Sequence, residues 1–257
     1  MEAKKFLIRL GLKFPKAISE PWDFPGYQVG KKDNKKEIRK VFLCLDLTEK
    51  CLPEIKKFNP DIIITHHPFI FGSRKDVFEN DPLKKEFADI LDNLPYPVYS
   101  YHTDFDKGEN GMNDTLLSLL PLEKTKVLED GLMRIAYLKE ETDIEGLAFF
   151  LKETWHLPYT FLSRGKKKKI RSFGLVAGGG ADMFKECLSA QADCYVSGDC
   201  AHHTRVDIRR YGVNYIGISH EVEEYGFLLG MKNAVLSIDK NIKVHEYEFE
   251  KDFDIFY

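Results

Sequence analysis

The sequence lacks the features that mark several specialised classes of protein. Its 257 residues include only five cysteines and no C-x-x-C pair, so neither a disulfide framework nor a zinc ribbon is expected. No run approaches the roughly 20 apolar residues that a membrane span needs, and the polar start at Met1 does not resemble a signal peptide. We therefore expect a cytoplasmic protein with no membrane-spanning segment.

An excess of either charge is also missing. The chain has 38 Lys and Arg against 41 Asp and Glu, a net charge of -3, so its surface as a whole does not predict nucleic-acid binding. The basic run from Arg164 to Arg171 is more typical of a solvated hairpin turn than of a phosphate contact. Neither a P-loop nor a GxGxxG motif is present. A small-molecule substrate is therefore a better expectation than nucleic acid.

What the sequence does contain is an alternation of short apolar strands and amphipathic helices. Residues 41–46 and 61–65 are typical of buried strands on either side of a helix at about 48–58, which together make a βαβ unit with a parallel strand pair. The same order returns as strand 173–177, helix 181–190 and strand 193–197, and in each copy an aspartate opens the second strand. Further helices are expected at 2–14, 82–93, 114–120 and 143–154, and further strands at 98–101, 132–138, 213–218 and 244–249.

Two adjacent histidines follow one of these strands. Ile62, Ile63 and Ile64 show no polar alternation, which is typical of a strand buried on both faces. His66 and His67 then lie at its C-terminal end, where open α/β sheets bind ligands. Neighbouring residues of an extended chain point to opposite sides, so two neighbouring ions with one histidine each suit this geometry better than one shared ion. A turn that happens to contain two histidines is the plain alternative.

Metal-competent residues also follow two other expected strands. Strand 98–101 leads to His102 and Asp106, and strand 213–218 leads to His220 and Glu224, which fall on one face if the chain there is helical. Imidazoles with carboxylates suit zinc, manganese, iron or nickel better than calcium. A carboxylate can bridge two ions about 3.5 to 4 Å apart, and Glu224 is our choice for that bridge.

These patterns together predict an α/β protein with two similar α/β halves and mixed, largely parallel sheets. We expect a first domain of residues 1–126 with 217–257, which carries most of the metal ligands, and a second domain of residues 127–216. The metal site is expected at the C-terminal ends of strands, between the two halves.

Several residues near these strand ends have two interpretations. His102 and His202 are candidates for a general acid or base, although His202 and its neighbour His203 are more typical of surface histidines. Gly178–Gly180 before a helix could bind a phosphate or simply form a tight turn. The loop from Glu20 to Gly30, rich in proline, glycine and aromatic residues, could cover a site or plug an edge of the core.

Several short motifs occur together in a fixed order. They are Trp22-Asp23 with Gly26 and Gly30, Thr65-His-His-Pro68, His102-Thr103 with Asp106, Gly178-Gly179, Ser197-Gly198-Asp199, and the pair His220 and Glu224. With this ordered set the chain, from about residue 2 to 257, resembles the NIF-three-like proteins, also called GTP cyclohydrolase I type 2 homologues or dinuclear metal-centre proteins.

The resemblance implies a site with two divalent metal ions per subunit. It implies that one ion takes His67 and Asp106, that the other takes His66 and His220, and that Glu224 touches both. It also implies a ring-shaped homohexamer with its sites facing an internal cavity, and the short form of the family without an inserted extra domain.

The chain departs from the usual family pattern at a few places. Phe24-Pro25 stands where family members usually continue with asparagine, and Asp104 replaces a common asparagine. Ser219 replaces a usual glycine, and Glu223 a small hydroxyl residue. None of these changes removes a proposed ligand, but neighbours of this kind orient ligands and tune bound water, so they bear on the lid and on substrate choice.

Two functions from different classes follow from this set of residues. The first is a metal-dependent hydrolase, with a nucleotide or a phosphoester as the substrate class considered. The second is a non-catalytic metal-binding scaffold or regulatory protein that binds partner proteins or nucleic acid, for which the lysine run is the only positive sign. Turnover of nucleotides and phosphoesters by metal-loaded protein, beside a His67→Ala control, distinguishes the two.

Overall fold

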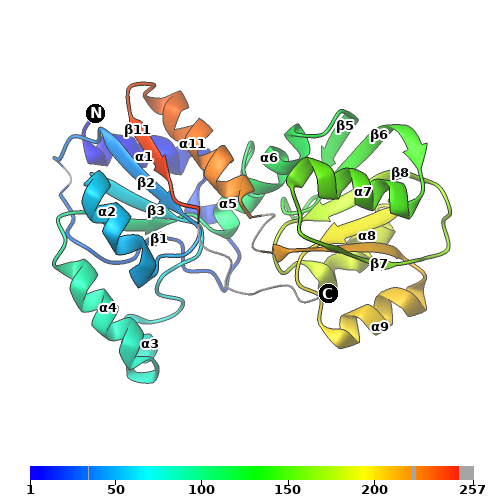
Figure 1. Cartoon of the computed structure of the whole chain (residues 1–257), viewed down its shortest axis with the longest axis horizontal. Coiled ribbons are helices and arrows are strands. Elements are labelled where there is room, and N and C mark those ends of the chain that lie inside the picture. The colour runs from blue at the N-terminus through cyan, green and yellow to red at the C-terminus, as the bar shows by residue number, and fades with distance from the viewer. Residues whose placement is uncertain (34, 221–223, 249–257) are drawn as a thin grey trace. The chain divides into compact units, whose positions relative to one another are not determined.

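The computed structural model describes residues 1–33, 35–220 and 224–248. The chain forms two compact units, one of Met1–Phe105 with the segment from Leu228 onward and one of Asp106–Phe227, each built on its own sheet (Figure 1). Each unit combines its sheet with helices, so the predicted α/β class with mixed, largely parallel sheets is confirmed. Among the described residues no helix is long and apolar enough to cross a membrane.

The first unit has a five-stranded sheet in the order β1-β4-β3-β2-β11, in which β1 is antiparallel and the other described strands are parallel. Its strands are β1 (Gly26–Tyr27), β2 (Lys40–Cys44), β3 (Ile62–Thr65), β4 (Val98–Ser100) and β11 (Lys243–Glu246). Its helices are α1 (Ala3–Lys13), α2 (Leu52–Phe58), α3 (Arg74–Asn80) and α4 (Pro82–Asp92), with the short turns η1 (Lys16–Ile18) and η2 (Glu49–Cys51). The chain passes between the units in α5 (Thr103–Lys107) and α11 (Gly226–Ile238).

The strand β3 is apolar on both sides, as its unbroken isoleucine run predicted. Ile62, Ile63 and Ile64 are all 0% exposed. Ile63 belongs to a core cluster with Ile55 of α2 and Leu91 of α4, and because side chains alternate along a strand, its two neighbours face the other side of the sheet. A strand buried in this way offers polar side chains only beyond its end.

The second unit has a six-stranded sheet in the order β5-β6-β8-β9-β10-β7. The strands β8, β9 and β10 are parallel neighbours, and β5, β6 and β7 add antiparallel edges. The strands are β5 (Leu122–Val127), β6 (Arg134–Thr142), β7 (Thr160–Ser163), β8 (Ile170–Val176), β9 (Cys194–Ser197) and β10 (Asn214–Ile218). The helices are α6 (Met112–Ser118), α7 (Ile144–Trp155), α8 (Phe184–Ser189) and α9 (His202–Tyr211), with the turn η3 (Ala181–Met183).

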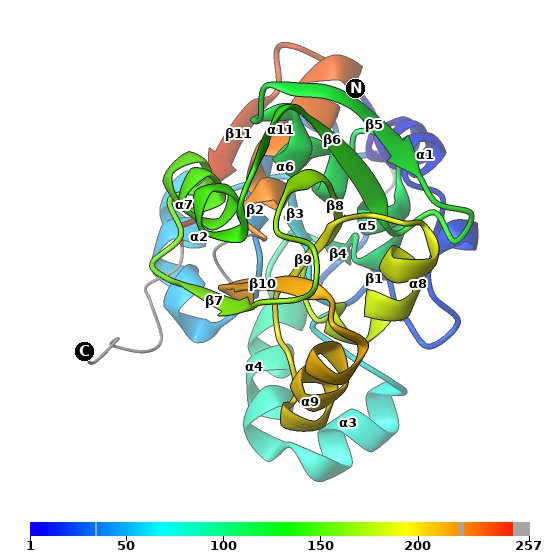
Figure 2. The same ribbon diagram turned by 90° about the vertical axis from the view of Figure 1, so that its right-hand side faces the viewer.

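Helices cover both faces of this second sheet. On one face Phe184 of α8 and Ile208 of α9 share a core cluster with Ile135 of β6. The preceding residue, Arg134, points to the opposite face, where its Nε donates to Asp114 Oδ1 of α6 at 2.7 Å. The helix α7 lies on the side of β7 and β10 away from α9 (Figure 2).

The internal repeat in the sequence has a structural basis. Asp61 precedes β3, and its Oδ2 accepts the backbone N–H groups of residues 39 and 40 at 2.8 and 2.9 Å, at the start of β2. Asp193 precedes β9, and its Oδ2 accepts the N–H groups of residues 171 and 172 at 2.9 and 3.0 Å, at the start of β8. In both units one carboxylate therefore accepts backbone N–H groups at the N-terminal end of a parallel strand pair, where these groups have no partner in the neighbouring strand.

Some elements and boundaries differ from the sequence predictions. The helices α3, α5 and α9 and the strands β1, β5 and β7 were not predicted. The strands β5 and β7 lie at the edges of the second sheet with few buried side chains, so they lack the apolar run that signals a buried strand. Because β5 pairs with β6 and β10 with β9, residues 106–126 and 217–227 belong to the second unit rather than to the first domain predicted. The predicted strand 244–249 corresponds to β11, and Phe249 lies outside the described residues.

Candidate metal centre

His66 and His67 follow β3 directly, and the backbone fixes both of them. Their N–H groups donate to Leu45 O at 3.2 and 3.1 Å. His66 is fully buried, and its Nδ1 lies 2.9 Å from Tyr101 O. His67 is partly exposed, and its Nδ1 lies 3.0 Å from Asp46 Oδ1. Because both partners are oxygen acceptors, Nδ1 carries the proton in each ring and the lone pair is on Nε2.

His102 is oriented in the same way at the end of β4. Its Nδ1 lies 2.9 Å from Asp23 Oδ1, while Thr103 donates to Asp23 Oδ2 from its N–H at 3.0 Å and from its hydroxyl at 2.5 Å. Burial alone would raise the pKa of Asp23, but the hydrogen bonds from His102 and Thr103 outweigh it and lower the pKa to about 2. Asp23 is therefore a carboxylate at neutral pH, and it keeps the lone pair of His102 on Nε2.

These three histidines form a group that could hold a metal ion. One ligand atom from each lies within 4.8 Å of the others. The ring centroids are 4.9 Å apart for His66 and His67, 5.1 Å for His66 and His102, and 5.6 Å for His67 and His102. A carboxylate or carbonyl on the second ring nitrogen is the arrangement that orients metal-binding imidazoles and raises their basicity. His102, predicted as a metal-competent residue and as a proton carrier but not as a ligand, thus lies among the metal-competent donors.

In the second unit His220 and Glu224 face each other. His220 Nε2 lies 2.9 Å from Glu224 Oε1, and the Glu224 N–H donates to His220 O at 3.2 Å. The two side chains predicted to share one face are therefore in contact, although residues 221–223 lie outside the described residues. The other ring nitrogen of His220 lies 2.9 Å from Asp199 Oδ2. Because Nδ1 donates to Asp199, the lone pair of His220 is on Nε2 and faces the negatively charged Glu224 carboxylate. A proton or a metal cation between the two atoms would stabilise this arrangement.

A turn at Gly178 leaves room for the side chains of His220 and Glu224. Gly178 has φ +75°, and a Cβ built there would lie 2.7 Å from Glu224 Oε1 and 3.4 Å from His220 Nε2. Any side chain at this position would occupy the space in front of both donor atoms. The Gly178 carbonyl accepts the Gly198 N–H at 3.0 Å. Of the two interpretations of Gly178–Gly180, the structure favours the tight turn.

A buried asparagine joins two parts of the second unit that carry candidate ligands. Asp106 is 8% exposed near the end of α5, and its carbonyl accepts from Asn113 Nδ2 at 3.3 Å. The Asn113 Oδ1 accepts the N–H of Ala177, next to Gly178, at 2.8 Å. Asn113 is 0% exposed, so it is a fixed link between the segment of Asp106 and the glycine turn. The sequence does not indicate this role, because the stretch around Asn113 has only the composition of a turn.

The predicted ligands do not all follow neighbouring strands of one sheet. The strands β3 and β4, which precede His66, His67 and His102, are neighbours in the first sheet. The strand β10, which precedes His220, belongs to the second sheet between β9 and β7. Asp106 and Glu224 also lie in the second unit, so two of the five predicted ligands are in the first unit and three are in the second. The pairing of β10 with β9 and β7, which sequence patterns do not encode, puts His220 in the second unit.

Other sequence candidates lie on open surface. His202 and His203 are exposed at the start of α9, and neither belongs to a possible metal-binding group among the described residues. The structure therefore favours the surface interpretation of these two histidines.

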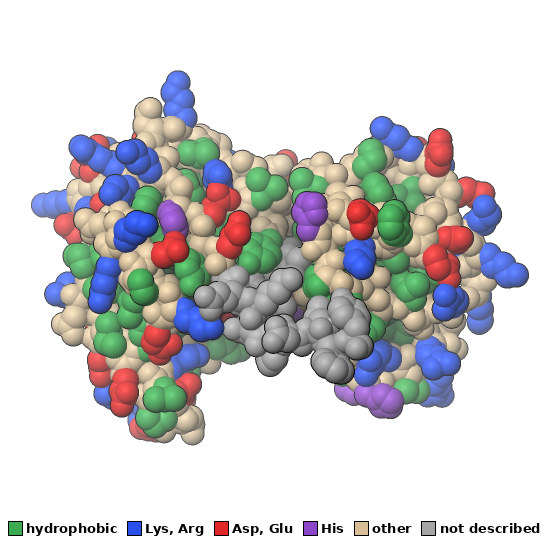
Figure 3. All heavy atoms as spheres, viewed as in Figure 1, with side chains coloured by type: hydrophobic (Ala, Val, Ile, Leu, Met, Phe, Trp, Pro, Cys, Tyr) green, Lys and Arg blue, Asp and Glu red, His purple; other side chains and the backbone are tan. Residues whose placement is uncertain are grey.

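Acidic partners neutralise most of the basic run. The ion pairs are Arg164 with Glu145, Lys167 with Asp193, Lys169 with Glu141 and Arg171 with Glu123. The run joins β7, which pairs with β10, to β8, which pairs with β6 and β9, so it is a loop and not the hairpin turn predicted. On the face drawn in Figure 3, Lys and Arg are mixed with Asp and Glu and do not gather in one patch.

One departure from the usual family pattern has a local explanation. Asp104 is 2% exposed, and burial, followed by the charge of Asp23, raises its pKa to about 7. With a pKa of about 7 this carboxyl is about half protonated at neutral pH, and its protonated form has one O–H donor and one carbonyl acceptor, much as an asparagine amide offers both. Asp104 can therefore take the place of the common asparagine without adding a full buried charge.

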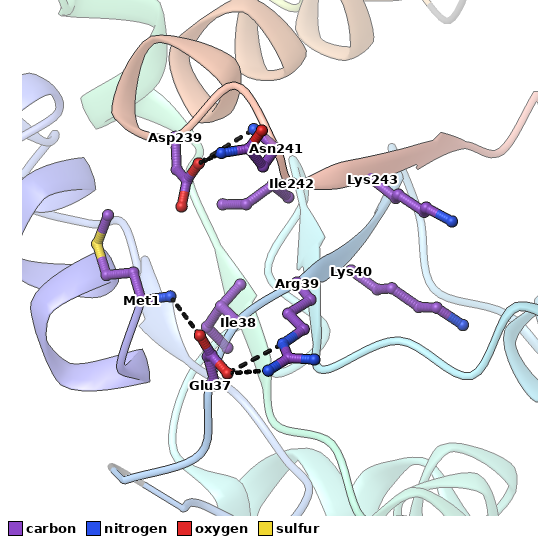
Figure 4. A pocket seen from close by; sticks show the side chains of 9 residues that line it. All are labelled: Met1, Glu37, Ile38, Arg39, Lys40, Asp239, Asn241, Ile242 and Lys243. Atoms are coloured by element: carbon purple, nitrogen blue, oxygen red, sulfur yellow. Dashed lines mark hydrogen bonds and ion pairs between the residues drawn. The ribbon is translucent and has the colours of Figure 1, made fainter.

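A separate pocket lies at the opposite end of the first unit's strands, near the N-terminus (Figure 4). Its volume is about 440 Å³, and its polar groups largely satisfy one another. Glu37 accepts from Arg39 Nε at 2.9 Å and pairs with the Met1 ammonium at 3.5 Å, while Asp239 accepts from the Asn241 N–H at 3.0 Å. The pocket contains no histidine or cysteine, so it offers no counterpart to the histidine cluster.

Comparisons with known proteins identify the family of this chain. The family model described as Duf34/NIF3 (NGG1p interacting factor 3) matches residues 1–252. A GTP cyclohydrolase 1 type 2 homolog of Clostridium perfringens is 27% identical over 228 residues, covering 86% of each chain. The homolog of the same name from Methanocaldococcus jannaschii is 28% identical over 246 residues, covering 94% of this chain and 96% of the relative. A Bacillus cereus protein related to NIF3 has the same fold, with a TM-score of 0.87 at 19% identity over 100% of this chain and 99% of that one. This chain, which the sequence motifs already likened to that group, therefore belongs to the Duf34/NIF3 family.

Proposed function

We propose that this protein is a metal-dependent hydrolase whose two divalent ions, zinc, manganese, iron or nickel, are held by His66, His67, Asp106, His220 and Glu224. The observation that carries the proposal is the state of the imidazoles. Each histidine of this set, and His102 beside it, has its Nδ1 on a carbonyl or carboxylate oxygen. A fixed Nε2 lone pair is what metal ligation requires of histidine.

The residues present fit the chemistry of such ions. Bound divalent ions act as Lewis acids on a substrate oxygen and make water nucleophilic near neutral pH. The carboxylates of Asp106 and Glu224 are 8% and 4% exposed, and burying such charges is favourable only beside a proton or a cation. Asp23 holds a proton on His102 Nδ1, so His102 would accept or deliver a proton at Nε2. We assign this role to His102 rather than to the exposed His202.

The first test of this proposal is metal content. Purified protein loaded with Mn²⁺ or Zn²⁺ is analysed by mass spectrometry beside His67→Ala, with His203→Ala as the control for an exposed histidine. We expect two ions per chain for the unchanged protein and for His203→Ala, and fewer for His67→Ala. Equal metal content in all three would refute the ligand set.

Catalysis needs a separate measurement. The loaded proteins are incubated with panels of nucleotides and phosphoesters, and hydrolysis is followed by product release. Turnover that is lost in His67→Ala supports the hydrolase. If the protein binds its full complement of metal but hydrolyses no member of either panel, it is a metal-binding protein and not a hydrolase of these substrate classes.

The ion pairs of the basic run weaken the case for the non-catalytic scaffold. Its sequence sign was the basic run, and four of that run's charges are in ion pairs. By resemblance we also expect a cytoplasmic homohexamer. Light scattering of the purified protein checks the assembly size.

A further inference from the structure

Three exposed aromatic side chains gather beside the histidine cluster of the first unit. Trp22 is 54% exposed, Phe24 41% and Phe71 49%. They come from the loop of residues 20–30 and from the loop that follows the two histidines, and we call them the aromatic platform. Single exposed apolar residues are common on proteins, whereas a cluster of them marks a binding surface.

The aromatic platform is in direct contact with the candidate site. The Trp22 and Phe71 rings have centroids 6.0 Å apart, and the Phe24 and Phe71 rings 5.5 Å. The His102 ring lies 5.9 Å from Trp22 and 6.4 Å from Phe71, and it lies 5.1 Å from His66. A molecule resting on the platform would therefore lie next to the histidines.

Buried hydrogen bonds hold the platform in place. Asp23, between Trp22 and Phe24, is fixed by His102 and Thr103, as described above. The side chain of Gln28, which is 5% exposed, donates to Phe24 O at 2.9 Å and accepts the Ile70 N–H at 2.9 Å. It therefore ties together the two loops that carry the aromatic rings. A surface built in advance loses little entropy when a ligand binds.

We propose that the aromatic platform binds a flat conjugated ring of the substrate, such as a nucleobase, by stacking on Trp22 and Phe71. Only the position of the substrate's reacting group, toward His102, rests on the proposed hydrolase function; the stacking itself does not. Aromatic rings stack on any flat π-system, and the platform itself has no charged side chain that would select an ion. A second protein is a poorer fit, because an interface needs about 800 Å² per partner and each half-exposed aromatic ring offers about 100 Å².

The distribution of tryptophan makes the ring contact directly observable. The chain has two tryptophans, Trp22 and Trp155. Trp155 is 6% exposed, and its Nε1 donates to Leu116 O at 3.1 Å. Quenching of tryptophan fluorescence by a bound ligand therefore reports on Trp22. The variant Trp22→Phe gives the background fluorescence of Trp155 and keeps an aromatic ring at position 22.

The experiment titrates the full chain with AMP, with GMP and with ribose 5-phosphate, which has the same phosphate but no ring. We expect quenching by the two nucleotides and none by ribose 5-phosphate. By calorimetry, Trp22→Ala and Phe71→Ala should each weaken nucleotide binding by about tenfold or more. Trp22→Phe should weaken it less, and Phe149→Ala, an exposed aromatic on α7 at 66%, should leave it unchanged.

Each outcome bears on the proposal. Equal binding of AMP and ribose 5-phosphate, or unchanged nucleotide binding in both alanine variants, would overturn it. A further outcome is that the unchanged protein binds no nucleotide while Trp22→Ala changes the assembly size. That result would assign the aromatic platform to contact with a second copy of the chain, and it would also overturn the proposal. Metal content measured on the same samples tests the proposed function separately, since nucleotides can stack on metal-free protein.

Discussion

Replacing Gly178 by alanine should weaken metal binding as well as the fold. The new Cβ would lie 2.7 Å from Glu224 Oε1, and this obstacle is the end of a side chain, which can move, rather than backbone. The left-handed φ of +75° adds about 1 to 2 kcal/mol of strain for a residue other than glycine. Metal ligation tolerates errors of only about 0.2 Å in ligand distance, so a displaced Glu224 should lower metal affinity on the order of 10- to 100-fold.

Gly179 supplies a matched control for this change. A Cβ built at Gly179 meets nothing within 4 Å, so Gly179→Ala should leave metal affinity intact. Calorimetric titration with Mn²⁺ compares the two variants, and urea unfolding in chelator measures the stability of each without metal. If Gly178→Ala binds Mn²⁺ as tightly as Gly179→Ala does, the glycine turn is not part of a metal site.

Three further predictions concern the hydrogen bonds that support the site and the fold. Because the pKa of Asp23 is lowered to about 2 in the folded chain, its carboxylate should contribute about 2 kcal/mol of stability above pH 4, which is lost as the pH falls toward 2. Asp23→Asn should remove that part of the pH dependence in urea unfolding, and an unchanged acid profile would contradict it. Asp61→Ala and Asp193→Ala should each cost about 1 to 3 kcal/mol, because two backbone N–H groups lose their acceptor. Their effects on unfolding should add, since the two carboxylates lie in different units. Asn113→Ala should cost about 2 to 3 kcal/mol and lower metal content, whereas Asn113→Asp should keep the bond from Ala177; equal metal content in all three proteins would show that the link does not position ligands.

The sequence alone predicted the elements whose side chains are strongly patterned. The unbroken isoleucine run of β3 predicted a strand buried on both faces, with the two histidines at its end, and the isoleucines are buried as predicted. The repeat of Asp61 and Asp193 was visible in the sequence for the same reason, because each carboxylate performs a local task beside its own strand.

Only the tertiary structure decided the contacts between segments that are distant in the sequence. The edge strands β5 and β7 have few buried residues, so the sequence did not predict them. Because they pair with strands of the second sheet, the second unit is longer than the second domain that was predicted. The oxygen acceptors of the imidazoles, among them Asp46 and Asp199, come from other loops, and no spacing rule links them to the histidines. The sequence determined which side chains can bind a metal, because that depends on their chemistry. The fold determined which nitrogen of each ring has the lone pair, because that depends on the residue packed against it.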